Sequence, residues 1–262
     1  MLQTRFKLLR QTLGMIETGN LLFLKLLARD PARARLFPGI VFRDYMALAG
    51  EGDWVTKQIR DIVSVPEGTR ITLEHLAGEG ISTPVDELAY LALISAAVRP
   101  QTIFEIGTFR GRTALNFALN SPENCVVWTM DLPPAADKNL TTDSLSADKH
   151  LIHSARPGID YQGKDVARKI RQLFANSLDF DFTQFENSID IVFVDGAHHY
   201  QAVLSDTQNA LKIVRPGGYI IWHDFANYGD YNDVTRAVLD SLPAKEIVQI
   251  ANSQLAVYRI PS

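Results

Sequence analysis

Cysteine is almost absent from this chain, since Cys125 is the single one among 262 residues. An internal disulfide is therefore excluded, and so is a zinc site built from several cysteines. Uncharged apolar runs are also short, and none approaches the ~18–20 residues that a membrane-spanning helix needs. A net charge of −4 gives no support to a dedicated nucleic-acid binder. With 46% apolar and 21% charged residues, the chain is expected to be a globular, cytoplasmic protein.

The first 35 residues differ from the rest in charge, because they carry seven basic and two acidic side chains. Apolar residues recur there at helical spacing, which predicts helices that pack against the domain or a second subunit in a homodimer. The alternative is a basic amphipathic helix that docks on a membrane. The apolar run at 21–24 is too short for a secretory signal. We expect residues 1–80 to form a helical appendage or lid, and residues 81–262 to form the main domain.

From residue 83 onward, apolar strands alternate with helices. Strands are expected at 102–106, 126–130, 170–174, 189–194, 219–222, 246–250 and 255–259, and the last two form a hairpin. Such alternation builds a doubly wound α/β fold with a mostly parallel sheet, here seven-stranded, and a ligand crevice at the carboxyl ends of the strands. The polar stretch 132–160 lacks periodicity, so it is expected to be an insertion at that edge.

A glycine-containing turn follows the strand at 102–106 and opens a helix. Its sequence is Glu105-Ile-Gly107-Thr108-Phe-Arg-Gly111-Arg-Thr113. In dinucleotide-binding turns a second glycine lets a pyrophosphate approach, and Phe109 in that place argues against an oxidoreductase with a nicotinamide cofactor. Amides at a helix start favour a carboxylate, and Glu105 suits an ammonium group. An amino-acid tail fits both, whereas a plain turn with packing glycines is the alternative.

An aspartate, Asp131, ends the next strand 20 residues after Gly111. An acid at this place can accept hydrogen bonds from both ribose hydroxyls, although a lone aspartate there often only caps a turn. An amino-acid tail together with a ribose describes S-adenosylmethionine. The spacing therefore predicts that cofactor.

Several segments in order resemble class I S-adenosylmethionine-dependent methyltransferases. Residues 105–113 resemble their motif I, and Asp131 is similar to their ribose-binding acid. Asn176-Ser177 resembles the G-D-S or G-A-S stretch that borders the adenine in the catechol O-methyltransferase-like branch, with Ala175 replacing the glycine. Residues 195–200 resemble the D-G-x-H-x-Y segment of a small-molecule O-methyltransferase group, and 215–224 resemble its R-P-G-G…D ending. The resemblance covers roughly residues 80–260 and implies a Rossmann-like methyltransferase fold. It implies cofactor binding by Glu105, Gly107, Thr108, Gly111, Thr113, Asp131, Asn176, Ser177 and Asp195.

The same resemblance implies a divalent metal held by Asp195, His223 and Asp224. Such a metal acts as a Lewis acid and lowers the pKa of a substrate hydroxyl. Magnesium prefers oxygen ligands, so an imidazole at 223 suggests manganese or another softer metal, or a supporting role for His223. The alternative is that Asp195 caps the following helix and His223 fills space.

His198 stands where relatives carry a lysine base. A neutral imidazole is a suitable general base near pH 7. His199 is its neighbour, and only one of the two can face the crevice if the chain is already helical there. Both histidines could instead lie at the surface and cap the helix that starts near Tyr200. His198 and Asp195 are the predicted catalytic residues.

The sequence therefore predicts an enzyme that O-methylates a small hydroxylated molecule with S-adenosylmethionine, assisted by a divalent metal such as Mg²⁺ or Mn²⁺. A metal-independent N- or O-methyltransferase with a histidine base is one alternative. A non-catalytic adenosylmethionine-binding scaffold is another. The Asp195, His198 and Asp224 set argues against the scaffold, since cofactor binding alone does not need it.

Overall fold

A computed structural model describes residues 54–77, 82–133, 156–226 and 232–262. The helices expected within residues 1–35, and most of the insertion expected at 132–160, lie outside these described residues. Within the described residues, no helix has the length and apolar character needed to cross a membrane.

The sheet has eight strands in the order β1-β7-β8-β6-β5-β2-β3-β4. Their bounds are β1 Val55–Lys57, β2 Thr102–Ile106, β3 Val126–Asp131, β4 Ile170–Phe174, β5 Ile189–Val194, β6 Val214–Trp222, β7 Val248–Ile250 and β8 Ala256–Arg259. The pairs among β2 to β6 are parallel, and β8 runs antiparallel to both β6 and β7. The expected mostly parallel sheet with a C-terminal antiparallel hairpin is confirmed.

The strand count is one higher than the sequence predicted. Residues 55–57 add β1 to the edge of the sheet, parallel to β7. The Trp54 indole N–H donates to Gln249 Oε1 at 2.9 Å, and its ring meets that of Phe225 edge-on at 5.0 Å. A three-residue strand shows no alternation of its own, so its pairing with a distant segment is what reveals it.

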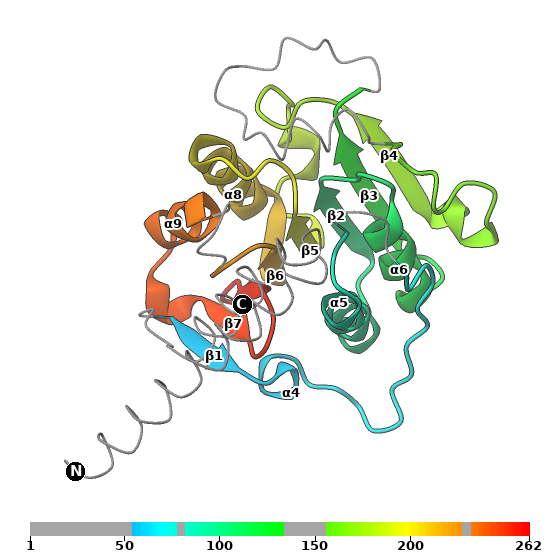
Figure 1. Ribbon diagram of the computed structural model, residues 1–262, viewed down its shortest axis with the longest axis horizontal. Coiled ribbons are helices and arrows are strands. Elements are labelled where there is room, and N and C mark those ends of the chain that lie inside the picture. Colours follow the sequence, from blue (N-terminus) through cyan, green and yellow to red (C-terminus); the bar gives the residue numbers. More distant parts are fainter. Residues whose placement is uncertain (1–53, 78–81, 134–155, 227–231) are drawn as a thin grey trace, which may run out of the picture. The chain divides into compact units, whose positions relative to one another are not determined.

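Helices cover both faces of the sheet (Figure 1). One face carries α4 Ile59–Ile62, α5 Val85–Val98 and α6 Arg112–Asn120, and the other carries α8 Tyr200–Ile213 and α9 Asn232–Ser241. Short 3₁₀ helices lie at Asp165–Lys169, Thr183–Phe185 and Ala244–Glu246. The layers are those of a doubly wound α/β domain.

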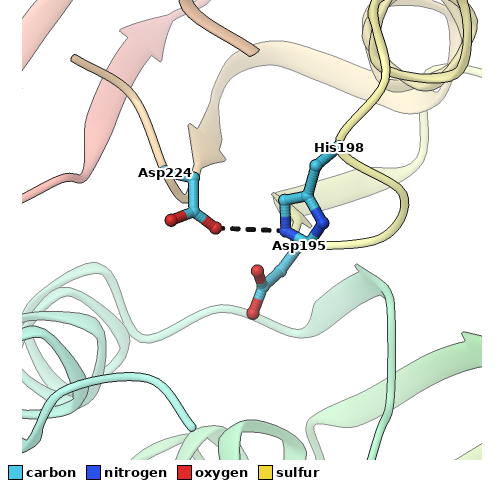
Figure 2. A group of neighbouring side chains, drawn as sticks. All are labelled: Asp195, His198 and Asp224. Atoms are coloured by element: carbon cyan, nitrogen blue, oxygen red, sulfur yellow. Dashed lines mark ion pairs between the residues drawn. The ribbon is translucent and has the colours of Figure 1, made fainter. Parts of the chain in front are cut away.

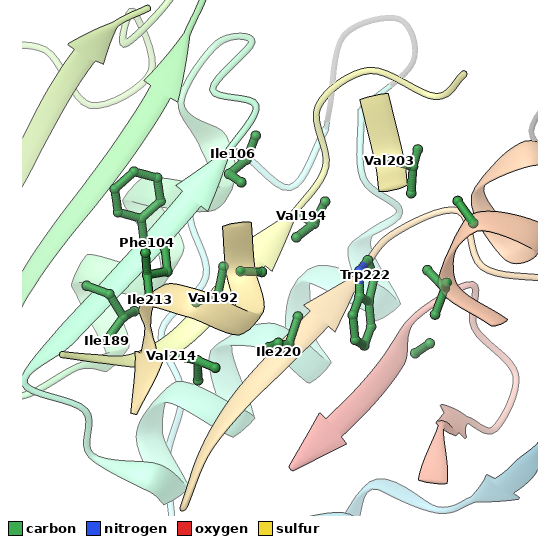
Figure 3. Close-up of a cluster of buried hydrophobic side chains, with 14 of the residues drawn as sticks. Phe104, Ile106, Ile189, Val192, Val194, Val203, Ile213, Val214, Ile220 and Trp222 are labelled. Atoms are coloured by element: carbon green, nitrogen blue, oxygen red, sulfur yellow. The ribbon is translucent and has the colours of Figure 1, made fainter. Parts of the chain in front are cut away.

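The central strands are buried on both sides, which explains why their sequences are mostly apolar. Phe104, Val192 and Trp222 face α8 and α9, where they pack with Val203 and Ile213 (Figure 3). The alternate strand residues face α5 and α6 on the other side. These two cores hold β2, β5 and β6 rigidly under the loops that follow them.

Candidate active site

The site is built where four parallel strands end in register. Ile106 pairs with Met130 and with Val194, and Val194 pairs with Trp222. The residues that follow these four are therefore brought to one edge of the sheet. They are Gly107, Asp131, Asp195 and His223. Strand register thus collects the glycine turn and three of the predicted functional side chains in one row.

A cavity of about 390 Å³ lies over this edge. Its wall includes most of the predicted site residues, namely Gly107, Thr108, Thr113, Asp131, Asn176, Ser177, Asp195, His198, His223 and Asp224. Glu105 and Gly111 are not part of the wall that the described residues form. One cavity therefore joins the predicted cofactor segments to the predicted catalytic cluster.

Gly107 is required by the close approach of two loops. Its φ is +102°, and a Cβ at this position would lie 2.0 Å from the carbonyl oxygen of Asp195. Gly111 has φ +85°, and a Cβ there would lie 2.5 Å from the Tyr161 ring. Both glycines are therefore fixed by packing, and Gly107 sets the distance between the turn and Asp195.

Asp131 holds the glycine turn through its carboxylate. Oδ2 accepts from the backbone N–H groups of Thr108 at 3.2 Å and Phe109 at 2.7 Å, and Oδ1 accepts from that of Leu132 at 2.8 Å. Burial raises the pKa of Asp131, and these hydrogen bonds oppose the rise. Asp131 thus binds the amides of Thr108 and Phe109, whereas the amides at the start of α6, which the sequence assigned to a ligand carboxylate, are not bonded to it.

Glu105 lies beneath the turn. It is buried, and its carboxylate accepts a hydrogen bond from the Thr129 hydroxyl. Burial raises the pKa of Glu105 well above its usual value, against the Thr129 hydrogen bond, and the charges of Asp195 and Asp131 raise it further. Its contact with a ligand ammonium group stays a prediction.

Three side chains from two loops meet in the wall of the cavity (Figure 2). Asp195 follows β5, Asp224 follows β6, and His198 precedes α8. One donor atom from each lies within 4.8 Å of the other two. His198 Nε2 is 3.1 Å from Asp224 Oδ2. Two carboxylates and one imidazole are thus close enough to share a cation.

His223 lies beside this cluster and contacts three carboxylates. Its Nδ1 is 2.9 Å from Asp224 Oδ2 and 3.2 Å from Asp195 Oδ1, and its Nε2 is 2.7 Å from Glu87 Oε2. Burial alone would lower the pKa of His223, but Asp195 and Asp224 outweigh it and raise the pKa well above its usual value. Both ring nitrogens face carboxylates, so the geometry suits a charged bridge better than the metal ligand that the sequence predicted.

Asp224 is stabilised in its charged form by the neighbouring histidines. Burial alone would raise its pKa, but the charge of His223 and hydrogen bonds from His198 and His223 bring it far below the usual range. Its φ is +54°, in the left-handed region.

Glu87 is a site residue that the sequence did not indicate. It is buried in the first turn of α5, and its Oε1 accepts from the backbone N–H of Gln254 at 2.6 Å. Its partner His223 is 136 residues away in the chain. Local pattern carries no signal for such a pair.

The two adjacent histidines have different positions. His198 lines the cavity, whereas His199 caps α8, with its Nδ1 accepting from the backbone N–H of Ala202 at 3.1 Å. The capping role that the sequence allowed for both histidines is thus taken by His199.

The segment after β4 lies at another part of the cavity wall. Asn176 is exposed, and its Oδ1 accepts from the Leu178 N–H at 3.2 Å. Ser177 hydrogen-bonds the buried carboxyl of Asp206, whose Oδ1 has no partner among the described residues. Burial raises the pKa of Asp206 to about 7, against the Ser177 hydrogen bond.

The sheet order, the glycine turn and the cavity at the carboxyl edge define a Rossmann-like fold of the class I methyltransferase type. Residues 104–225 match the family model described as "Methyltransferase domain". This match agrees with the S-adenosylmethionine-dependent methyltransferase domain that the sequence motifs predicted.

The chain is similar in fold to one solved structure and resembles other proteins less extensively. Cofactor-bound Rv0187 from MTB superposes with a TM-score of 0.50 at 16% identity, covering 84% of this chain and 88% of that one. The O-methyltransferase TomG from Streptomyces achromogenes gives 0.48 at 17% identity, covering 70% and 83%. "Uncharacterized protein R132" of Acanthamoeba polyphaga mimivirus is 30% identical over 128 residues, 48% of this chain. The chain matches 52% of that relative's length, about half.

Proposed function

We propose that this protein transfers a methyl group from S-adenosylmethionine to a hydroxyl oxygen of a small molecule. The observation that carries the proposal is the single cavity that joins the glycine turn and Asp131 to Asp195, His198 and Asp224. Binding the cofactor alone does not require a cluster of two carboxylates and an imidazole at the far end of its pocket.

The cofactor would lie along the row of strand ends. Asp131 would accept a hydrogen bond from a ribose hydroxyl with the one lone pair, on Oδ1, that its three backbone contacts leave. Residues 107–113 would face the amino-acid tail, and Asn176 and Ser177 would border the adenine. The methyl group would then point toward Asp195 and His198.

The transfer is an in-line displacement. The acceptor oxygen forms a bond to the methyl carbon, the carbon–sulfur bond breaks, and its electron pair stays on sulfur. The hydroxyl proton must leave as this bond forms, so the site needs a group that lowers the pKa of the hydroxyl or takes the proton. Holding the oxygen close to the methyl group and excluding water supply the rest of the rate.

The donor set fits a divalent metal. Asp195, Asp224 and His198 would hold it, and one imidazole with two carboxylates suits Mn²⁺, Fe²⁺ or Zn²⁺ better than Mg²⁺. Bound there, the metal would supply Lewis-acid activation of the substrate hydroxyl. His223 and Glu87 would keep Asp195 and Asp224 in place through the contacts described above.

A metal-independent transfer is the second candidate, and the His198–Asp224 contact of 3.1 Å favours it. His198 would then be the general base that takes the substrate proton. The two candidates differ in the task of His198, because a neutral imidazole that binds a metal through one nitrogen carries its proton on the other and cannot accept a second one.

The test measures methyl transfer from labelled S-adenosylmethionine to a panel of phenols and hydroxylated sugars, after chelation and after adding Mn²⁺, Zn²⁺ or Mg²⁺. Methylated product that requires added metal supports the first candidate. Full activity in chelator, lost in His198→Ala, supports the second. If the protein does not bind S-adenosylhomocysteine in calorimetry, both candidates are wrong.

A further inference from the structure

One face of α6 carries three polar side chains at four-residue spacing, Arg112, Asn116 and Asn120. The two asparagines form hydrogen bonds with the segment 72–76, which we call the strap. The Thr72 N–H donates to Asn120 Oδ1 at 2.8 Å, and Asn120 Nδ2 donates to the Thr72 carbonyl at 2.7 Å. Glu74 pairs with Asn116 in the same way, at 3.0 and 3.2 Å. Each amide thus bonds both backbone groups of one strap residue, as a neighbouring strand would.

The two repeats match in length, which explains why the pairing continues along the helix. Four residues of an α-helix advance ~6 Å, and two residues of extended chain advance about 6.6 Å. The second N–H of each amide donates to the helix carbonyl four residues earlier, Arg112 O at 2.8 Å and Asn116 O at 2.7 Å. The asparagines are therefore already oriented for the strap.

Arg112 joins the strap to the cofactor cavity. Its Nη2 donates to the Leu76 carbonyl at 3.2 Å, and its Nη1 donates to the Thr83 carbonyl at 2.7 Å. Arg112, Thr83 and Thr113 all line the cavity, and the hydroxyls of the two threonines are 3.5 Å apart. The strap and this part of the wall thus share one buried guanidinium.

We propose that Arg112, Asn116 and Asn120 are positioning residues, through which strap docking and cofactor binding stabilise each other. The inference rests on the proposed binding of adenosylmethionine in this cavity. A cofactor that packs against Thr83 and Thr113 favours the arrangement in which Arg112 is anchored on both carbonyls. Because the two equilibria are linked, release of the strap must lower the affinity for the cofactor by the same factor by which the bound cofactor favours the docked strap.

The docked state of the strap can be measured directly, because the Thr72 and Glu74 amide protons are hydrogen-bonded to the asparagine side chains. Residue-resolved hydrogen exchange of the full chain, with and without S-adenosylhomocysteine, should show slower exchange at these two amides when it is bound. This measurement needs no variant.

The matched variants test the reverse direction. Asn120 lies about two helical turns, ~12 Å, from Arg112 and does not line the cavity. Asn120→Asp keeps the acceptor for Thr72 N–H but turns a carboxylate oxygen toward the Thr72 carbonyl. It should weaken S-adenosylhomocysteine about fivefold in calorimetry, the lower end of coupling between linked sites. Ser121→Ala, which removes a hydroxyl from the same helix end, should leave the affinity unchanged.

Wild-type binding with unchanged exchange at Thr72 and Glu74 would overturn this inference alone. So would an Asn120→Asp variant that loosens the strap but keeps wild-type affinity. Failure of the wild type to bind S-adenosylhomocysteine would instead refute the proposed function.

Discussion

Gly107→Ala should damage the protein through two separable effects. The first is backbone strain, since an L-residue held at positive φ costs ~1–2 kcal/mol. The second is the added Cβ, placed 2.0 Å from the Asp195 carbonyl oxygen and 2.5 Å from its carbon. These are backbone atoms, so the two loops must separate, and overpacking of this kind costs ~1–3 kcal/mol.

Gly163→Ala is the matched control. Gly163 has φ +76°, close to the left-handed value of many turns, and a Cβ there meets nothing within 4 Å. This variant therefore suffers strain without the clash. The difference in free energy of unfolding between the two variants, measured in urea, isolates the contact between the turn and Asp195.

We expect Gly107→Ala to be about 1–3 kcal/mol less stable than Gly163→Ala. S-adenosylhomocysteine binding should fall by at least about tenfold only in Gly107→Ala, because ~1.4 kcal/mol of lost contact is tenfold in affinity. Equal stability of the two variants, together with wild-type affinity in both, would show that the turn and Asp195 are not held by this contact.

Three aspartates at the site and one behind it give further predictions. Asp131→Ala should weaken S-adenosylhomocysteine about tenfold or more in calorimetry, because hydrogen bonds to charged groups contribute ~1.5–3 kcal/mol; unchanged affinity excludes a ribose contact. Asp195→Asn and Asp224→Asn should each abolish Mn²⁺ binding in electron paramagnetic resonance, and Mn²⁺ retained by both contradicts the site. Asp206 ionises near 3.8 when unfolded but at about 7 when folded, so wild-type stability falls as pH rises between these values. Asp206→Asn has no carboxyl group to ionise at this position. Its free energy of unfolding, measured in urea, should therefore rise by about 2–3 kcal/mol relative to that of the wild type between about pH 5 and pH 8.

The sheet was predictable because its central strands are buried on both faces. The sequences at 102–106 and 189–194 are mostly apolar, each with one acidic residue, and that pattern indicates parallel strands between two helical layers. The row of Gly107, Asp131 and Asp195 follows from this, since each residue directly succeeds such a run. Strand β1 could not be predicted in this way. Its three residues are too few to show a pattern, and only their pairing with β7 identifies them as a strand.

The charged cluster was predictable in membership but not in pairing. The sequence placed His198 beside Asp195 and Asp224 and made His223 a metal ligand, whereas in the structure both His223 nitrogens lie against carboxylates. The unexpected partner is Glu87 of α5, whose Oε2 is 2.7 Å from His223 Nε2. A buried acid with a partner so far along the chain leaves no local signal.

The role of the polar face of α6 was also not predictable from the sequence. Arg112, Asn116 and Asn120 at four-residue spacing resemble a solvated helix face, and sequence alone assigns them no task. The structure buries Arg112 and Asn116 beneath the strap. The Asn116 amide and the two terminal nitrogens of Arg112 bond backbone groups, while Arg112 Nε has no hydrogen-bond partner among the described residues. Buried polar side chains are stable only when such partners are present. Their burial beside the cavity therefore requires the strap, and this makes residues 72–76 part of the site's support although they touch no predicted ligand.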